Sequence, residues 1–486
     1  MSALPWLVAL PLLAGIATFV LPERSRAPVG LAFSLPVLAL SLWVLARVAG
    51  GDTSPHVLGG WAAPLGILLI VDGAAAGMLV LTALVSTACA CHAARYLRGK
   101  TANAHFWPLL WFMWAALNGI WLSGDLFNLY VGIELLGLAA VGLVALAGQA
   151  EALAAAMRYL LAALLGSLAY LIGVALIYAS LGSLALPDLA IASFDGNGRV
   201  TIAVALTLMT IGLMLKTALF PLHAWLPPAH GGALSPVSAL LSALVIKASF
   251  FILLRLWLAL SPDAVPLALA WLLGVLGAGA VFWGGWMAWR QTRLKQLVAY
   301  STVAQIGYLF LFFPLATTTV DAAARLAWDG MMLMLLSHAL AKAGMFLAAG
   351  NLILAVGSAQ IAHLAGVSRF RPLSLLSFGV AGVSLMGLPP SGGFAAKWLL
   401  LQSALASGQW IWIVVLVLGG LLAAAYIFKV FRHAFVEGPK RDHFESPPLA
   451  LELSALTLAL ASLVLGLAAH HPLEWLRIAS PFGGAG

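Results

Sequence analysis

The residues of this sequence that can do chemistry are a few charged side chains placed inside long apolar stretches. Glu134 lies in "DLFNLYVGIELLGLAAVGL", with apolar neighbours on both sides. Four lysines share this setting, namely Lys216, Lys247, Lys342 and Lys397. Desolvation and neighbouring like charge both favour the neutral form of a lysine, so such a group can accept and release protons near neutral pH. The pattern therefore predicts proton transfer along buried side chains.

These charges cannot face lipid. A charged group at the bilayer centre costs roughly 2.5–3.5 kcal/mol on insertion scales, so five of them would cost roughly 12 kcal/mol or more. They must face the interior of a helix bundle, pair with one another or line water. The alternative interpretation is a set of static salt bridges. The number of charges excludes this interpretation, because one buried carboxylate cannot neutralise four buried lysines. The surplus lysines must therefore be hydrated, or neutral for part of the time.

Three histidines lie close to these groups in the sequence. His338 and Lys342 are four residues apart in "SHALAKAGMF", so they share one helix face, and we expect His338 to relay protons. His223 follows Lys216 beyond a proline, and His230 lies in "PPAHGG". Both are assigned to a secondary proton path. The other interpretations stay open, because a lone membrane histidine is commonly a packing residue, and His230 is either a gate or a loop residue.

No motif for a cofactor or a metal ion accompanies these residues. Cys89 and Cys91 are the two cysteines, and their spacing is typical neither of a disulfide framework nor of a zinc site. The sequence has no glycine-rich phosphate loop, CxxC pair or haem-attachment motif. No cluster of histidines or carboxylates has metal-ligand spacing. We therefore expect no cofactor, no metal and neither a redox nor a hydrolytic centre in this chain.

The composition shows which elements must hold the charges. Of 486 residues, 63% are hydrophobic and 8% are charged, and the mean hydropathy is +1.05. A soluble domain carries about 25% charged residues, so this chain is an integral membrane protein without a sizeable soluble domain. The net charge of +8 is scattered through short loops, which argues against nucleic-acid binding. The start, "MSALPWLVALPLLAGIATFVLPERSR", lacks the basic region of a signal peptide and is interpreted as a retained first span.

Stretches long enough to cross a bilayer, about 20 apolar residues each, recur along the chain. They lie near residues 3–21, 28–46, 66–93, 106–122, 126–148, 156–181, 201–226, 233–258, 265–289, 296–314, 327–355, 373–402, 410–433 and 449–470. The sequence therefore predicts an all-α membrane protein of about fourteen transmembrane helices, forming a single polytopic membrane domain.

The charges between these stretches are asymmetric. Loops after odd-numbered helices hold Arg24, Arg26, Arg95, Arg98, Lys100, Arg158, Arg290, Arg293, Lys295, Arg369, Arg371, Arg432, Lys440 and Arg441. The other side holds Arg47, Arg199, Arg255, Arg325 and Arg477 beside Asp52, Asp188, Asp195, Asp263, Asp321 and Asp329. Because basic loops stay in the cytoplasm, both termini are predicted to face outward, which requires an even number of helices.

Two of the predicted helices are interrupted. One contains Pro221, Pro227, Pro228 and Pro236 with the pair Gly231–Gly232, and the other contains "GLPPSGGFAAK" at 387–397. Proline frees the carbonyl four residues back, and such a group survives in hydrocarbon only where protein or water covers it. Paired broken helices in two halves of a bundle indicate a transport site built on inverted repeats. Ordinary proline kinks are the alternative, although each break has a lysine beside it.

Five stretches together resemble the proton-translocating antiporter-like subunits shared by respiratory complex I, membrane-bound hydrogenases and Mrp-type cation/proton antiporters. They are "LFNLYVGIELL", "LKTALFPLHAWLPPAHGGALSPVSALLSALVIK", "LKQLVAYSTVAQIGYL", "SHALAKAGMFLAAGN" and "GLPPSGGFAAKW". The resemblance covers roughly residues 60–435. "GGWAAPLGILLIVD" at 59–72, with "LFNLYVGIE", is most similar to the D-type subunit of Mrp antiporters.

The resemblance implies two inverted five-helix repeats at helices 4–8 and 9–13, with discontinuous helices 7 and 12. It divides the chain into N-terminal helices 1–3 at 1–105, a first repeat at 106–260, a second at 265–435 and a last helix at 449–470. It also implies roles in proton transfer for the matching residues, which are Glu134 of helix 5, Lys216 of helix 7, Lys247 of helix 8, His338 and Lys342 of helix 11, and Lys397 of helix 12.

Two departures qualify the match. Helix 12 carries Lys397 where some family members have glutamate, and the chain ends soon after helix 14 without the long lateral helix of the largest subunits.

The expected function is a proton-translocating subunit of a multi-subunit Mrp-type monovalent cation/proton antiporter in the inner cell membrane of a prokaryote. Its expected partners are other membrane subunits, protons, sodium or potassium ions and the lipid bilayer. The alternatives are a pump subunit of a complex I-like NADH:quinone oxidoreductase or membrane-bound hydrogenase, and a stand-alone carrier or scaffold.

Overall fold

The computed structural model describes residues 3–61, 66–191, 197–259, 267–318, 320–437 and 447–482. The elements of the first part are α1 (Trp6–Val20), α2 (Glu23–Ala49), β1 (His56–Val57), η1 (Leu58–Gly60), β2 (Leu68–Leu69), α3 (Gly73–Tyr96), α4 (Asn103–Leu122), α5 (Leu126–Ala145), α6 (Ala150–Leu181), α7 (Leu186–Ile191) and α8 (Asn197–Thr217). The middle part holds α9 (Leu226–Gly232), α10 (Ser235–Leu240), η2 (Leu241–Val245), α11 (Ile246–Ala259), α12 (Leu267–Arg290), α13 (Leu294–Phe310) and α14 (Phe312–Ala316). The last part holds α15 (Asp321–Val356), η4 (Ile361–Leu364), α16 (Val367–Phe370), α17 (Pro372–Met386), α18 (Gly392–Ala406), α19 (Trp410–Ala434), α20 (Leu449–Leu467) and α21 (His470–Leu476).

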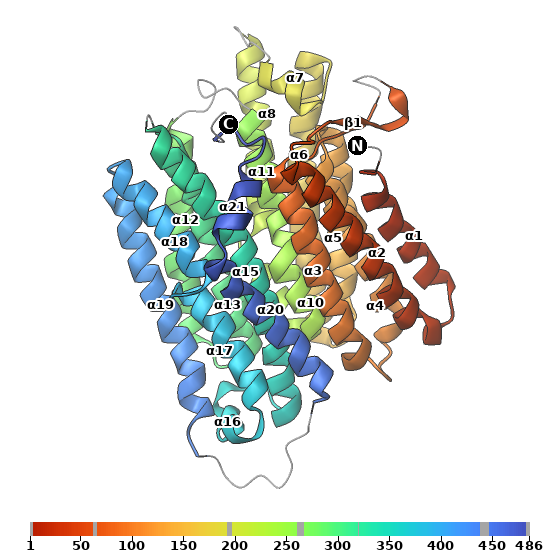
Figure 1. Ribbon diagram of the computed structural model, residues 1–486, viewed down its shortest axis with the longest axis vertical. Coiled ribbons are helices and arrows are strands. Elements are labelled where there is room, and N and C mark those ends of the chain that lie inside the picture. Colours follow the sequence, from red (N-terminus) through yellow and green to blue (C-terminus); the bar gives the residue numbers. More distant parts are fainter. Residues whose placement is uncertain are drawn as a thin grey trace.

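The long helices run side by side along the longest axis of the molecule (Figure 1). Within the described residues, eleven of them are long and apolar enough to cross a membrane, and α1 and α17 are shorter apolar helices of 15 residues each. The predicted helical membrane architecture is therefore confirmed, apart from one short hairpin of two strands. The number of such helices is smaller than the fourteen predicted crossings partly because α17 and α18 are two 15-residue halves of one interrupted segment, each shorter than a bilayer-spanning helix.

The start of α1 and the segment after α21 lie at the same end of the bundle, drawn uppermost in Figure 1. A small hairpin lies at this end, in which β1 pairs antiparallel with β2 so that His56 faces Leu69. α16 and the end of α19 lie at the opposite, lower end (Figure 1).

The core is formed by three helical elements that are almost wholly buried. Other helices bury the continuous segment from α10 through η2 to α11 completely, and they bury most of α13 and α15. α15 packs against α10, α13, α17, α18 and α20, and it also contacts α3. Outer helices such as α2, α8 and α12 bury only about a third of their residues, 33–39%. Two of the predicted lysines, Lys247 and Lys342, belong to the buried central elements, on α11 and α15.

Both predicted interruptions occur, and the chain covers the carbonyl groups that each of them frees. α8 ends at Thr217, and Ala218 then takes the left-handed conformation (φ 58°), which breaks the helix. The freed carbonyl of Leu215 accepts a hydrogen bond from Trp225 Nε1 at 2.9 Å. α17 ends at Met386, followed by Gly387 at φ 82°. At this second break Lys397 Nζ donates to the Leu385 and Met386 carbonyls. Such protein-supplied partners explain how broken backbone is tolerated inside an apolar bundle.

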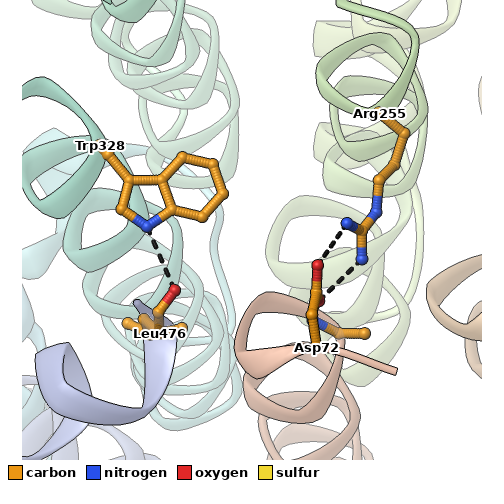
Figure 2. A network of polar contacts seen from close by, with 5 residues as sticks. Asp72, Arg255, Trp328 and Leu476 are labelled. Atoms are coloured by element: carbon orange, nitrogen blue, oxygen red, sulfur yellow. Dashed lines mark hydrogen bonds and ion pairs between the residues drawn. The ribbon is translucent and has the colours of Figure 1, made fainter. Parts of the chain in front are cut away.

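Two ion pairs lock helices together at the upper end. Asp72 starts α3 and receives two hydrogen bonds from the Arg255 guanidinium of α11, at 2.5 and 2.8 Å (Figure 2). Arg477 pairs with Asp329, which lies two turns inside α15 and is 1% exposed. Close by, Trp328 Nε1 donates to the Leu476 carbonyl at 3.2 Å (Figure 2). Sequence analysis counted Arg255, Asp329 and Arg477 among the loop charges and gave Asp72 no partner, and it therefore missed both pairs.

Candidate functional site

Glu134 and Lys216 face each other between α5 and α8. Lys216 Nζ lies 3.8 Å from Glu134 Oε1 and 3.5 Å from the Ile133 carbonyl oxygen. The lysine side chain is 9% exposed and the glutamate 24%. The stem of Lys216 fits against α6 because Gly166 has no side chain there, where a Cβ would come within 3.0 Å of Lys216 Cγ. The pair is therefore held by three helices and remains partly accessible at the carboxylate.

A small cavity of about 20 Å³ adjoins Lys216. Its walls include Gly137 of α5, Tyr159 of α6, Val245 of η2 and Ser249 of α11. A space of this size holds about one water molecule. Ser249 also receives a hydrogen bond from the Thr217 hydroxyl at 3.0 Å, so hydroxyl groups lie beside this cavity on the side of α11.

Lys247 lies two residues past the end of the π-helical segment η2, on the fully buried part of α11. Its Nζ donates to the Ser242 carbonyl oxygen at 3.0 Å. Single π-helical turns inside α-helices occur frequently at functional sites, because they displace backbone groups from the regular ladder. In this turn the ammonium group binds a backbone carbonyl, and within the described residues it has no carboxylate partner.

A string of hydroxyl and carbonyl groups connects Lys247 with Lys342. The Ser242 hydroxyl lies 2.9 Å from the Thr302 hydroxyl of α13. Thr302 Oγ1 donates to the Val298 carbonyl at 3.0 Å, and the same carbonyl accepts from Lys342 Nζ at 3.0 Å. Lys342 also donates to the hydroxyl of Ser301. Two buried lysines on different helices thus share one hydrogen-bonded network through α13.

The residues described so far form a line through the bundle, from the Glu134–Lys216 pair through Lys247 to Lys342. Lys397, on α18, lies at the far end of this line. Its Nζ donates to the Leu385 and Met386 carbonyls at 2.9 and 3.2 Å, which are the last carbonyls of α17. The same ammonium lies 4.4 Å from the ring centre of Tyr308, a distance at which a cation is attracted to an aromatic face. Gly387 is required at this turn, because its φ is positive and a Cβ would meet Lys397 Cδ at 2.7 Å.

A further hydroxyl pair lies between Lys342 and Lys397. His338 is one turn from Lys342 on α15, is 1% exposed and has no hydrogen-bond partner for either ring nitrogen. The neighbouring Ser337 hydroxyl lies 2.8 Å from the Ser384 hydroxyl of α17. Ser384 precedes Leu385, whose carbonyl binds Lys397. A buried imidazole with two unpaired nitrogens can take up a proton or form a hydrogen bond with a water molecule.

The two histidines of the predicted secondary path differ from each other. His230 is completely buried in α9, between the rings of Trp225 and Phe346, and neither ring nitrogen has a partner. It is therefore part of a helix, and the interpretation as a loop residue is wrong. His223 lies in the break, stacks on Phe220 and leaves its Nδ1 without a partner.

Several polar residues of this line carried no signal in the sequence. Ser242, Ser301, Thr302 and Ser337 lie within apolar helices, where a single hydroxyl is unremarkable. Lys295, assigned to a loop by its charge, belongs to α13 and donates to the Ala233 carbonyl at the end of α9. Only the packing of α9, α13 and α15 reveals that these groups meet.

The fold and the site together define a class of protein, a many-helix membrane bundle with lysines beside two interrupted helices and more lysines along its buried axis. Residues 123–423 match the family described as NADH:quinone oxidoreductase/Mrp antiporter, transmembrane. The chain belongs to this family.

Relatives within the family include subunits of two kinds of complex. The chain is 37% identical over 455 residues to the N-type subunit of the NADH-quinone oxidoreductase of Desulforudis audaxviator, covering 90% of this chain and 89% of the relative. It is 28% identical over 439 residues to the D-type subunit of the Na(+)/H(+) antiporter of Alkalihalophilus pseudofirmus, covering 89% of this chain and 87% of that one.

Solved structures show the same fold along almost the whole chain. A chain of the Mrp complex from a Dietzia species superposes with a TM-score of 0.88 at 28% identity, covering 98% of this chain and 96% of that one. A chain of an archaeal membrane-bound sulfane sulfur reductase gives 0.91 at 26% identity, covering 99% and 98%. Both are subunits of multi-subunit membrane complexes, and the chain is a multi-span membrane protein of the same kind.

Proposed function

We propose that the chain is a proton-translocating subunit of a multi-subunit Mrp-type monovalent cation/proton antiporter. The observation that carries the proposal is the buried line from the Glu134–Lys216 pair to Lys397, in which polar partners bridge between helices without a second carboxylate in the described residues. The Na(+)/H(+) antiporter subunits of the D type among the relatives, and the resemblance of residues 59–72, support the choice of complex.

The line suggests how protons move. While Glu134 lies near, its charge keeps Lys216 protonated. When the carboxylate turns away or takes up a proton, the buried ammonium loses its compensation and releases its own proton through the adjoining cavity towards Lys247. The hydroxyls between Lys247 and Lys342, and then His338, carry it on to Lys397 at the second break. Coupling to cation movement resides in the contacts with neighbouring subunits.

A second function is favoured by a different observation. The relative that is 37% identical is a subunit of a redox-driven complex, so the same line of lysines would serve as one proton pathway of a complex I-like NADH:quinone oxidoreductase or a membrane-bound hydrogenase. In that case the driving reaction occurs in other subunits, because the residues assigned to the line transfer protons only.

Vesicles containing the complete complex distinguish the two functions. For an antiporter, adding Na⁺ or K⁺ to vesicles with a preformed proton gradient collapses the gradient, with no redox substrate present. For a redox-driven pump, a gradient forms on adding an electron donor and is indifferent to the cation. Mass spectrometry of the gently solubilised complex identifies the partner subunits. A complex that does neither, although fully assembled, would favour the scaffold interpretation.

We further infer fourteen crossings, arranged as two inverted five-helix repeats. Each predicted apolar segment coincides with a helix or with an interrupted helix, and the two breaks follow α8 and α17, in the seventh and twelfth segments. Both described ends lie at one end of the bundle, which fits an even number (Figure 1). The first repeat then spans 106–260, the second 265–435, and helices 1–3 and 14 flank them.

Charge asymmetry leads us to expect the upper end of the bundle outside the cell. In a background lacking Cys89 and Cys91, a cysteine at exposed Ser54 should react with a membrane-impermeant maleimide in intact cells. A cysteine at exposed Lys100 should react only after permeabilisation. Lys440, another predicted cytoplasmic position, lies outside the described residues. Labelling of position 100 in intact cells would reverse the proposed orientation.

A further inference from the structure

A groove of about 810 Å³ opens between the ends of α12 and α19, away from the buried lysines. Three of the side chains that line it are basic, namely Arg290, Lys429 and Arg432. The rest of the lining is mainly aromatic. α19 ends at the lower end of the bundle (Figure 1), the end that the loop charges predict to be cytoplasmic.

The three cations have no acidic partner within the described residues. Lys429 Nζ donates to the Trp289 and Gln291 carbonyls at 2.6 and 2.7 Å, which fixes the ammonium over the end of α12. Glu437, the acid that follows them on the same segment, pairs instead with Arg369 at 2.8 Å. A concave surface with three positive charges and no acidic partner in the described part of the chain therefore attracts an anion.

The aromatic part of the lining is exposed. Phe428 is 60% and Phe435 66% exposed, and Trp289 on the opposite wall is 44% exposed. Phe428 and Phe435 are seven residues apart, so they lie on one face of α19. Tryptophan concentrates at the membrane–water interface, where one side of its ring meets acyl chains, and phenylalanine adds apolar surface for those chains. The groove thus combines an apolar wall for hydrocarbon with a basic rim.

We propose that this groove binds an anionic phospholipid of the cytoplasmic leaflet. Arg290, Lys429 and Arg432 hold the phosphate of the head group, and the acyl chains lie against Trp289 and Phe428. Arginine favours this ligand because its planar fork donates two parallel hydrogen bonds to phosphate oxygens. The charge complementarity and the exposed aromatic wall at one interface favour a lipid over an acidic peptide, which needs no hydrocarbon surface. The proposal does not depend on which complex contains the chain.

Native mass spectrometry of the full complex, purified in mild detergent, tests this inference. The groove variant carries Arg290→Gln, Lys429→Gln and Arg432→Gln. The matched control carries Arg95→Gln, Arg98→Gln and Lys100→Gln, which remove three charges from the same predicted side. Each basic residue near an anionic surface contributes about fivefold in affinity, so three contribute roughly 100-fold. Each complex is delipidated and then titrated with phosphatidylglycerol. Wild type and control should bind this lipid at least about tenfold more tightly than the groove variant. Phosphatidylcholine should bind weakly to all three.

Two outcomes overturn the proposal. One is equal retention of phosphatidylglycerol by wild type and groove variant. The other is a photo-crosslinker at position 428 that captures a neighbouring subunit instead of lipid in the intact complex, which would identify the groove as a subunit contact. If the triple variant fails to assemble, the double variant Arg290→Gln/Arg432→Gln serves, because both arginines are exposed and neither is a donor in the described hydrogen bonds.

Discussion

Replacing either Glu134 or Lys216 with alanine is expected to stop ion translocation while the complex still assembles. The two groups lie 3.8 Å apart in a largely desolvated site, and at an effective dielectric constant near 20 their attraction is about 4 kcal/mol. Removing one partner of a buried pair costs about 3–5 kcal/mol unless the remaining group changes its protonation state. We expect that change here, so that Glu134→Ala leaves Lys216 neutral and Lys216→Ala leaves Glu134 protonated.

A locked protonation state removes the switch but preserves the fold. Flux should therefore fall to about one per cent of wild type or less, since proton transfer by a positioned side chain contributes roughly 100-fold or more. Residues that act as one unit give non-additive losses, so the double variant should transport no less than either single one. Proton and cation flux are measured in vesicles containing wild type and the three variants.

The control for this series is the amount of assembled complex on a native gel, together with Lys100→Ala, which removes an exposed lysine remote from the pair. Substantial flux in either single variant at normal assembly would contradict the carrier role and favour a scaffold. Additive losses in the double variant would show instead that the two residues act separately.

The second large effect concerns Lys397. Alanine at this position should abolish translocation, because it removes the last ionisable group of the line. It also leaves the Met386 carbonyl without this donor and the Leu385 carbonyl with Gln305 Nε2 as its remaining side-chain donor. Arginine should fail as well. It keeps a positive charge over the end of α17 and the ring of Tyr308, but a guanidinium is effectively always protonated in proteins and cannot release a proton.

The comparison of the two variants separates charge from proton transfer. Both are assayed for flux in vesicles at equal amounts of assembled complex. Transport by Lys397→Arg at the wild-type rate would mean that the site supplies a fixed charge that neutralises the carbonyl end of the broken helix. Loss in both variants, with a normal thermal denaturation midpoint for Lys397→Arg, is the outcome that the relay requires.

Sequence alone determined the membrane class, the helices, the two breaks and the glutamate and four lysines of the proposed line. Each of these rests on a local property. A run of apolar residues fixes a helix in lipid whatever surrounds it, proline removes a backbone donor wherever it stands, and a lysine within an apolar run is costly unless it is buried. Periodicity also placed His338 beside Lys342, because both lie on one helix.

What the tertiary structure decided is which of these groups meet. The partners of Lys247, Lys342 and Lys397 are carbonyls and hydroxyls, some of them on other helices, and such groups have no distinctive sequence pattern. The pairs of Asp72 with Arg255 and Asp329 with Arg477 join residues that are 183 and 148 positions apart, so loop position and charge gave no indication of them. Only the packing of the helices brings these groups within hydrogen-bonding distance, since a contact between helices depends on their relative position and rotation and not on the composition of either one.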